Sequence, residues 1–592
     1  MISGRYVRRR TMDLLVKGVI LTTLIVFFIQ MTTSYPKGGY KRQEPSIATE
    51  QQISVSKREN QKSEADKDVE YSQKQVEESK LAVQPVAVTE KKTSPMPTRK
   101  SRKGEFYENI LIHFDLKGAP PKVPYFLDLL RLIAKGGATG ILLEWEDMFP
   151  WTGELEKFKN SDAYSLDDVK AILDEARTLQ LDVIPLVQTF GHLEWILKYE
   201  ETRKYRENDA YPNVLCLGSV EGVKLVKEAL RQVIDVHKPY GIPSFHIGAD
   251  EAFEFGVCAE SLEWIRHNGA EGGKQMLALA HLKSIAQYVK ALAGYSTRVL
   301  AWHDMLKDFQ PSLIRKLDLG AIIEPVVWDY SENIVTMNDH SFAVIAENFP
   351  TMWASSAFKG ANFPAATFSD VRHYETNNRN WIGTKKQQQG KFQNGFRGII
   401  ITGWQRYDHM AMLCEILPMG TASLILNLQT ALNAPNMDQT LTRGQAAKIL
   451  GCPGFNVAGT GLISNQCTFK GFDVYAIYQG QAQNMIKDVE QELSKNHPMM
   501  GWGNRYNRRY NISQNWYHRE MLGFVRNLAG RCDQVETSLR NAMKPLFFDN
   551  TIDEFIYENI GPTSEKLHNY IDEIQRLDQL RAWPKRNFPI KI

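Results

Sequence analysis

Eight short apolar runs, separated by segments with helical spacing, limit the fold of this chain more than any other feature. Most of the runs contain almost no polar residue, as expected for parallel strands that are covered on both faces. They predict strands at residues 110–115, 140–145, 182–188, 244–248, 298–302, 321–328, 351–357 and 398–404.

The segments between these strands carry apolar residues three and four positions apart. Val169, Ile172 and Leu173 are one example of this amphipathic helical spacing. Eight strand–helix units in succession favour a (β/α)8 barrel over an open doubly wound sheet. No glycine-rich phosphate turn follows the first strand, which also disfavours an open nucleotide-binding sheet. We therefore predict an α/β chain with a TIM barrel over residues 105–435.

Residues 14–31 (LLVKGVILTTLIVFFIQM) are apolar except for Lys17 and a few neutral polar side chains. About 18 helical residues, rising ~1.5 Å each, are just enough to span the hydrocarbon layer. Several arginines precede the run, and positive residues favour the cytosolic side. We expect residues 1–13 to be a cytosolic tail and 14–31 an uncleaved transmembrane signal anchor. The chain would then be a single-pass type II membrane protein with a lumenal or extracellular enzyme domain, in the Golgi or plasma membrane.

Residues 32–104 are rich in Lys, Glu, Gln, Ser and Pro and contain few aromatic residues. Such a segment cannot bury enough apolar surface to offset the entropy that ordering would cost. It is predicted to be a disordered stem between the anchor and the barrel.

Residues 436–592 show a different pattern, in which apolar residues recur mainly at helical spacing. Leu522, Val525 and Leu528 form one stripe, and Leu567 and Ile574 belong to another. This C-terminal region is predicted to be mostly helical and without catalytic residues. It could pack on the barrel or pair two copies of the chain in a homodimer.

The formal net charge is only +3 over 592 residues, which implies no broad basic surface for nucleic acid. The six cysteines are scattered and form no CxxC pair, so a zinc ribbon or a thioredoxin-like site is not supported. Cys452 and Cys467 could bridge a short loop in a lumenal protein, or both could be buried thiols.

Catalytic residues of such barrels lie at the carboxyl ends of the strands. Acidic and aromatic side chains recur at these ends, a profile typical of a sugar pocket. In strand order they are Glu144 and Asp147, then His192, His246, Asp250 and Glu251, then Trp302 and Asp304, then Trp328 and Tyr330, and finally Trp404, Tyr407 and Asp408.

The run at residues 245–251 (FHIGADE) resembles the catalytic signature of glycoside hydrolase family 20, usually His-x-Gly-Gly-Asp-Glu, with Ala249 in place of the second glycine. The runs at 143–150 (LEWEDMFP) and 188–192 (QTFGH) make the chain look most similar to the hexosaminidase D branch of that family. The resemblance covers about residues 105–430. It implies an exo-β-N-acetylhexosaminidase that removes terminal GlcNAc or GalNAc from glycoproteins or glycolipids, with no metal and no other cofactor.

Glycoside hydrolysis needs a proton donor at the leaving oxygen and stabilisation of positive charge at the anomeric carbon. The resemblance implies that the 2-acetamido oxygen of the substrate is the nucleophile, so that configuration is retained. Glu251 would be the general acid and then the base, and Asp250 would bind the acetamido N–H. Adjacent residues of a regular strand face opposite ways. Both acids can therefore reach one sugar only if the strand ends or bulges there.

The acetamido group also needs a small apolar cage, which Trp302, Trp328 and Trp404 could form; each is otherwise ordinary core. Tyr330 is our candidate for the hydroxyl that orients the attacking carbonyl, and Tyr407 is the alternative.

Further polar residues at the strand ends have two interpretations. The histidines could support the acid pair or could be structural: His192 and His246. The acids could bind ring hydroxyls or could be solvated or salt-bridged: Glu144, Asp147, Asp304 and Asp408.

Two other functions fit parts of the sequence. An anchor followed by a stem is typical of Golgi glycosyltransferases, but the single DxD motif, at residues 66–68, falls inside the predicted stem. A non-catalytic glycan-binding protein could keep such a pocket, although the intact Asp250–Glu251 pair favours an enzyme.

Overall fold

The computed structural model describes residues 102–268, 271–458, 461–463 and 466–585. The predicted cytosolic tail and signal anchor, and the predicted stem up to residue 101, lie outside these residues. Of the helices that are described, none has both the length and the apolar character needed to cross a bilayer.

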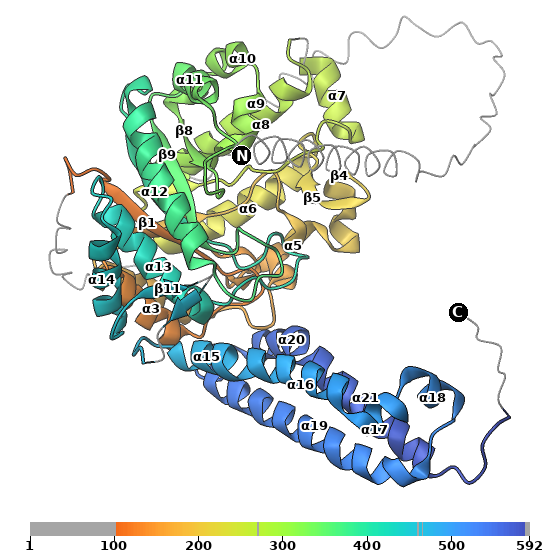
Figure 1. Ribbon diagram of the computed structural model, residues 1–592. Coiled ribbons are helices and arrows are strands. Elements are labelled where there is room, and N and C mark those ends of the chain that lie inside the picture. The colour runs from red at the N-terminus through yellow and green to blue at the C-terminus, as the bar shows by residue number, and fades with distance from the viewer. Residues whose placement is uncertain (1–101, 269–270, 459–460, 464–465, 586–592) are drawn as a thin grey trace, which may run out of the picture. The chain divides into compact units, whose positions relative to one another are not determined.

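Eight parallel strands close into a barrel, and each coincides with one of the eight predicted runs (Figure 1). The strands follow one another around the barrel in chain order, and the last pairs with the first. They are β1 Asn109–Asp115, β2 Gly140–Glu144, β3 Asp182–Leu186, β6 Ser244–His246, β7 Arg298–Trp302, β8 Ile323–Trp328, β9 Met352–Lys359 and β10 Phe396–Gly403. The predicted (β/α)8 barrel is confirmed.

A helix follows each strand and covers the outside of the barrel. Some of these helices begin at a clear cap: Ser165 and Asp168 form a capping box at the start of α4. The helices are α3 Val123–Lys135, α4 Leu166–Thr178, α6 Val220–His237, α8 Lys274–Ala293, α10 Pro311–Lys316, α11 Asp339–Asn348, α12 Val371–Gln388 and α13 Leu417–Leu432, with α5 Glu194–Leu197, α7 Ala259–Asn268 and α9 His303–Asp308 in the loops.

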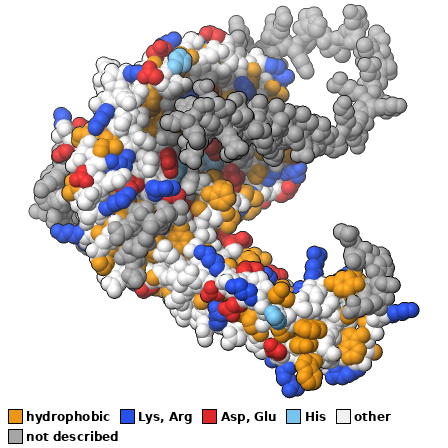
Figure 2. Space-filling view, viewed as in Figure 1, with side chains coloured by type: hydrophobic (Ala, Val, Ile, Leu, Met, Phe, Trp, Pro, Cys, Tyr) orange, Lys and Arg blue, Asp and Glu red, His pale blue; other side chains and the backbone are white. Residues whose placement is uncertain are grey.

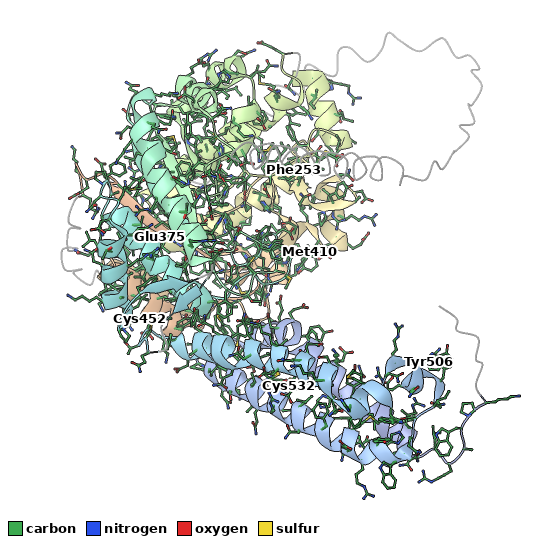
Figure 3. All side chains as sticks on the ribbon, viewed as in Figure 1. Phe253, Glu375, Met410, Cys452, Tyr506 and Cys532 are labelled. Carbon is green, nitrogen blue, oxygen red and sulfur yellow. A yellow bond between two sulfur atoms is a disulfide. The ribbon has the colours of Figure 1, made fainter. Side chains whose placement is uncertain are left out.

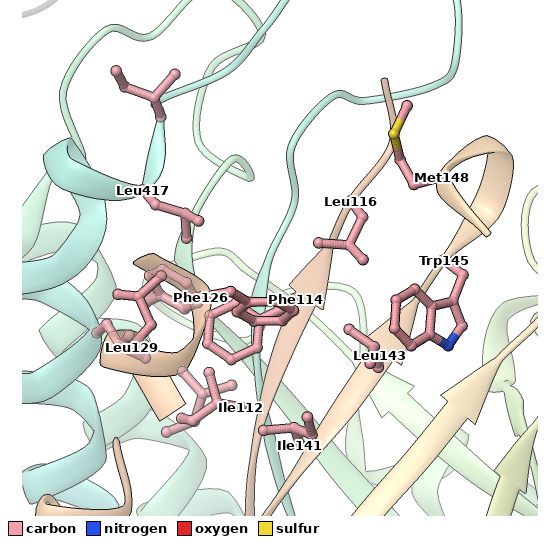
Figure 4. Close-up of a cluster of buried hydrophobic side chains, with 14 of the residues drawn as sticks. Ile112, Phe114, Leu116, Phe126, Leu129, Ile141, Leu143, Trp145, Met148 and Leu417 are labelled. Carbon is pink, nitrogen blue, oxygen red and sulfur yellow. The ribbon is translucent and has the colours of Figure 1, made fainter. Parts of the chain in front are cut away.

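The strands bury alternate side chains on two sides. Ile112 and Phe114 of β1 face outward and pack against Phe126 and Leu129 of α3 (Figure 4). Leu111, which precedes Ile112 and faces the opposite side of the strand, belongs to a second buried cluster inside the barrel. Each such side chain contributes roughly 1.5–3 kcal/mol by burial, so both clusters hold the barrel closed.

Strands β3 and β6 end two residues earlier than predicted, at Leu186 and His246. Gly248 has φ +66°, and a Cβ there would lie 1.8 Å from the Gln188 Oε1 atom, so this position requires glycine. The chain therefore leaves the sheet before residues 188–192 and 248–251. Both segments are free to turn toward the mouth of the barrel.

The C-terminal region is helical, as predicted, apart from one short hairpin. The predicted stripes lie on α19 and α21, which pack against each other. On the face shown in Figure 2, hydrophobic side chains gather near α17 and α18, where Met500, Tyr506 and Trp516 are exposed. The elements are α14 Gln439–Leu450, α15 Phe472–Ile477, α16 Gln483–Lys495, α17 His497–Gly501, α18 Arg505–Tyr510, α19 Asn515–Met543, α20 Asp549–Asn559 and α21 Gly561–Asp578, with β11 Asn456–Ala458 and β12 Gly461–Ile463.

Two disulfides cross-link the described chain. Cys452 pairs with Cys467, which decides between the two interpretations of these residues. Cys216 pairs with Cys258, a bond that their spacing does not suggest. The second disulfide lies beside an unpredicted hairpin formed by β4 Arg206–Asn208 and β5 Tyr211–Leu215.

Candidate active site

The turn after β6 brings two neighbouring acids to the same side. Ala249 and Glu251 both have left-handed backbone conformations, with φ +72° and +48°. The Ala249 N–H donates to the Gln188 side chain (3.2 Å), and the Glu251 N–H donates to Asp304 Oδ2 (2.8 Å). Such conformations cost non-glycine residues energy and persist only where their surroundings fix them. Asp250 and Glu251 thus face one cavity, as expected if the strand ends here.

His192 stands between the acids. Its Nε2 atom lies 3.5 Å from Asp250 Oδ2 and 3.3 Å from Glu251 Oε2, and its Nδ1 lies 3.9 Å from Glu194 Oε1. Burial disfavours a charged imidazole, but these three carboxyl groups raise the pKa of His192 to about 10. Burial raises the pKa of Asp250 to about 7, although the charged His192 opposes this shift. The Glu251 side chain is more open, at 39% exposed.

The acids line a cavity of about 220 Å³ at the carboxyl ends of the barrel strands. Of the predicted site residues, seven line it: both acids, His192, Trp328, Tyr330, Trp404 and Tyr407. The other lining residues are Lys117, Gln188, Gly360 and Ala361. The cavity thus joins a charged side to an aromatic side.

Aromatic rings form another part of the cavity wall. Trp328 and Tyr330 stack with ring centroids 5.4 Å apart. Trp404 lies 5.8 Å from Trp302, which is fully buried beneath the cavity and does not line it. Of the three predicted cage tryptophans, Trp328 and Trp404 line the cavity together with Tyr330. Trp302 belongs to the buried cluster inside the barrel against which the other two pack.

Three buried atoms of cavity-lining residues have no hydrogen-bond partner in the described chain: His192 Nδ1, Asp250 Oδ1 and the Tyr330 hydroxyl. The last two are an acceptor and a donor, and the Tyr330 hydroxyl lies near Ser355, Thr402 and Trp404 without normal hydrogen-bond geometry. Burial raises the pKa of the Tyr330 phenol, so it stays a neutral donor. Unsatisfied buried polar atoms cost about 1–3 kcal/mol each, and a ligand that pairs with both would recover this energy.

Lys117 was not among the predicted site residues, although it follows the end of the first strand by only two residues. Its ammonium lies 3.2 Å from Asp115 Oδ2 and 3.4 Å from Glu144 Oε1, and His113 Nε2 lies 3.3 Å from Glu144 Oε2. Burial disfavours the Lys117 charge, but the carboxylates raise its pKa well above the usual value. Lys117 is thus a fixed cation in the cavity wall.

Other predicted site residues do not line the cavity, because their polar atoms are engaged elsewhere or buried. Asp147 accepts from the Gly118 N–H and from Asn160. Asp304 accepts from the Glu251 N–H and from Trp328 Nε1.

Glu144 and His246 are also displaced from the expected positions. Glu144 pairs with Lys117 and His113, so it supports the cavity wall from behind. His246 is buried against Trp302, with ring centroids 4.4 Å apart, and burial lowers its pKa to about 3. Asp408 lines a neighbouring groove. Of the two interpretations of these acids, the structure thus favours the ion-paired or hydrogen-bonded one for Glu144, Asp147 and Asp304.

Glu554 of α20 joins the C-terminal region to a loop of the catalytic cavity. The Arg406 guanidinium donates to both Glu554 carboxylate oxygens, each at 2.6 Å, and Arg406 Nη1 also donates to the Ala411 carbonyl (2.8 Å). Arg406 lies between Trp404 and Tyr407. The helical region thus fixes the loop that carries two cavity residues.

Two groups of described residues have the composition of a metal site. Glu207 lies near Cys216 and Cys258, but these cysteines form a disulfide. The second group contains Glu146, Asp147 and His409. There His409 Nδ1 lies 2.8 Å from Glu146 and its Nε2 lies 2.8 Å from the Lys198 ammonium, so an ion-pair network already uses both ring nitrogens.

Comparison with known proteins shows the family of this chain. The catalytic-domain model of glycosyl hydrolase family 20 matches residues 144–408. Hexosaminidase D of Homo sapiens is 32% identical over 473 residues, 79% of this chain and 94% of that protein. Hexosaminidase D of Bos taurus is 39% identical over 329 residues, 55% of this chain and 92% of that protein. A solved family 20 exo-β-N-acetylglucosaminidase of Vibrio harveyi, in complex with N-acetylglucosamine, is 13% identical, with TM-score 0.42 and 58% coverage of each chain.

The sequence matches decide the family. The family match begins at Glu144, at the end of β2, and ends at Asp408, after β10, so it contains the ends of the second to eighth barrel strands. The human relative is aligned over nearly its whole length. This chain therefore belongs to glycosyl hydrolase family 20 and is a glycoside hydrolase of the β-N-acetylhexosaminidase type.

Proposed function

We propose that the chain is a retaining exo-enzyme that removes terminal GlcNAc or GalNAc with the 2-acetamido group of the substrate as nucleophile. The observation that carries this proposal is the pair of unpartnered buried atoms, Asp250 Oδ1 and the Tyr330 hydroxyl. An acetamido group has one N–H donor and one carbonyl acceptor, which match this pair. The rings of Trp328 and Trp404 supply an apolar surface for its methyl group.

The first step breaks the glycosidic bond. Glu251 donates its proton to the glycosidic oxygen while the acetamido carbonyl oxygen bonds to the anomeric carbon, which gives an oxazolinium ion and a free alcohol. Asp250 accepts a hydrogen bond from the acetamido N–H and balances the positive charge. The Tyr330 hydroxyl donates to the carbonyl oxygen and holds it toward the anomeric carbon before attack.

The second step reverses the roles. The Glu251 carboxylate removes a proton from a water molecule as its oxygen bonds to the anomeric carbon, and the acetamido C–O bond to that carbon breaks. Two inversions leave the original configuration. Lys117 and Tyr407 line the cavity and can donate to ring hydroxyls, which places the terminal sugar against the aromatic wall of Trp328 and Trp404.

Turnover of 4-nitrophenyl β-N-acetylglucosaminide and its galacto isomer tests this function directly. We expect both to be hydrolysed, with the β-anomer of the free sugar as the first product by NMR. A thiazoline analogue of the oxazolinium ion should inhibit competitively. Hydrolysis of the 2-hydroxy glucoside at a similar rate, or indifference to the thiazoline, would show that the acetamido group does not participate.

His192→Gln is predicted to move the acid limb of the kcat/KM profile to higher pH. The charged His192 lowers the pKa of Asp250, which burial raises to about 7. Without that charge the Asp250 pKa rises further, so the carboxylate needed for the acetamido N–H forms only at higher pH. His340→Gln, at an exposed site on α11, is the matched control and should leave the profile unchanged. If the acid limb of His192→Gln stays at the wild-type pH, His192 does not control the pKa of Asp250 that the profile reports.

Glu554→Gln is predicted to lower kcat/KM about tenfold, because Arg406 loses a charge-assisted pair worth about 1.5–3 kcal/mol, reduced here by partial exposure. The loop between Trp404 and Tyr407 would lose its fixed position. The control is Asp553→Asn, the next residue, whose partner Arg540 lies at the surface. Circular dichroism should show a folded barrel in both variants. Full activity of Glu554→Gln would mean that the helical region does not support the site.

We also propose that residues 14–31 anchor the enzyme in a membrane, with the barrel on the lumenal or extracellular side. The apolar run and its preceding arginines support this topology. The disulfides Cys216–Cys258 and Cys452–Cys467 are consistent with an oxidising compartment. Carbonate extraction and protease protection of sealed microsomes test it: release by carbonate, or digestion of the barrel without detergent, would contradict the proposal.

A further inference from the structure

A second hollow, of about 380 Å³, lies next to the catalytic cavity. Four separate segments line it: the start of α5, the β4–β5 hairpin, the chain after Glu251 and the chain after Tyr407. Phe253 and Met410, both labelled in Figure 3, come from the third and fourth of these segments. We call this hollow the outer groove. Its residues used below are Glu194, Tyr211, Phe253, Glu254, Asp408 and Met410.

The outer groove is continuous with the cavity along the chain. The Phe253 N–H donates to the Glu251 carbonyl (3.0 Å), so the groove begins one turn beyond the proposed acid. Asp408 directly follows Tyr407, which lines the cavity. His192 bridges both hollows, with Nε2 toward Glu251 and Nδ1 toward Glu194. The leaving group carries the glycosidic oxygen that Glu251 protonates. It must therefore begin at this junction between the cavity and the outer groove.

The groove exposes large apolar side chains that do not serve the core. Phe253 is 77% exposed, Met410 65% and Tyr211 56%. Large apolar side chains that stay in water contribute no burial energy to the fold. Several of them together at the mouth of a binding cavity therefore indicate a surface that contacts a ligand. Aromatic faces suit the C–H faces of a pyranose ring, whose hydroxyls need acceptors around its edge.

The groove supplies those acceptors as carboxylates. Glu194, Glu254 and Asp408 line it, and no Lys or Arg is among the described residues of its lining. Glu194 is only 4% exposed, and its Oε2 atom has no hydrogen-bond partner in the described chain. A buried, unpartnered carboxylate oxygen beside a hollow is costly unless a ligand donates to it.

We propose that the outer groove binds the leaving-group sugar of the substrate, and that its carboxylates select a neutral sugar and reject one that carries a carboxylate, sulfate or phosphate. A neutral pyranose donates its hydroxyls to the three acids while a ring face rests on Phe253 or Tyr211. An anionic sugar would meet like charges, and the nearby charged His192 is already paired with Glu194, Asp250 and Glu251. This inference rests on the proposed hydrolysis and adds the class of aglycone.

Three substrates separate the groove from the catalytic cavity. N-acetylglucosaminyl β-fluoride has no aglycone sugar, a β-linked disaccharide with a neutral second sugar fills the groove, and the matching disaccharide with a glucuronate second sugar tests its charge. In Phe253→Ala and in Tyr211→Ala we expect kcat/KM for the neutral disaccharide to fall about fivefold. The fluoride should be hydrolysed as by wild type. Tyr295→Ala removes an exposed tyrosine that is not part of the groove lining and is the control.

Glu254→Gln tests the charge selection, because glutamine keeps the shape and can still accept from Asn208. We expect the preference for the neutral over the glucuronate disaccharide to fall about fivefold, and the wild-type preference to weaken at high salt. Equal losses on fluoride and disaccharide in the alanine variants, or a wild-type enzyme that accepts both disaccharides equally, would overturn the groove assignment. Failure of wild type to hydrolyse even the fluoride would instead overturn the proposed hydrolase function.

Discussion

Replacing Glu251 by glutamine is expected to lower kcat for a disaccharide about a thousandfold, within the usual range of general acid–base catalysis. Glutamine keeps the size of the side chain but cannot transfer a proton. A sugar alcohol is a poor leaving group, so the loss should be largest there. 4-Nitrophenolate leaves without a full proton, and its glycoside should lose less activity. Rates on both substrates, measured at saturation, check the prediction.

Glu347→Gln makes the same chemical change at an exposed site on α11 and should keep wild-type rates. Equal melting temperatures of Glu251→Gln and wild type would show that the loss is chemical, since the Glu251 side chain is already 39% exposed. If Glu251→Gln keeps more than a tenth of the wild-type activity on the disaccharide, another group is the acid.

The fold could be predicted because its determinants are local. Each barrel strand is an apolar run and each helix an amphipathic stripe, so periodicity alone places all eight units. The exact strand ends could not be placed. They depend on a contact between distant residues, the close approach of Gln188 to Gly248. The hairpin β4–β5 was missed for a related reason, since its polar strands show no alternation.

The site was predictable only as far as strand ends imply it. Asp250 and Glu251 follow from the motif at one strand end, and Trp328, Tyr330 and Trp404 from position. The sequence does not show which carboxylates already accept hydrogen bonds from other groups of the folded chain. Asp304 accepts hydrogen bonds from the Glu251 N–H and the Trp328 indole, and only the folded structure shows these contacts. Lys117 stood out in no pattern, because a lysine becomes a site residue only through the carboxylates around it.

The C-terminal helices carry no motif, and their place in the site comes from one long-range pair. Arg406 and Glu554 are 148 residues apart. Neither is unusual for a surface helix or loop, and the pairing depends on how α20 docks beside the barrel. The same holds for the outer groove, whose Tyr211 and Met410 are ordinary exposed residues until the fold brings them to one hollow.

Asp250→Asn is expected to lower kcat about a hundredfold, similar to the loss of one preorganised group that stabilises transition-state charge. The asparagine carbonyl can still accept the acetamido N–H, so KM should change little. What is lost is the negative charge opposite the forming oxazolinium ion. Because that charge acts on the acetamido side, the loss should be the same for 4-nitrophenyl and disaccharide substrates. This equality distinguishes Asp250 from Glu251.

The pH profile gives an independent check of the same residue. Burial raises the pKa of Asp250 to about 7, so wild-type kcat/KM should fall as the pH drops below that value and the carboxylate becomes protonated. Asp250→Asn has no proton to gain there, and its residual activity should lack this acid limb. Asp308→Asn, at an exposed surface ion pair, should keep it. An acid limb that survives in Asp250→Asn would have to belong to another group, and the charge opposite the oxazolinium ion would then come from elsewhere in the wall.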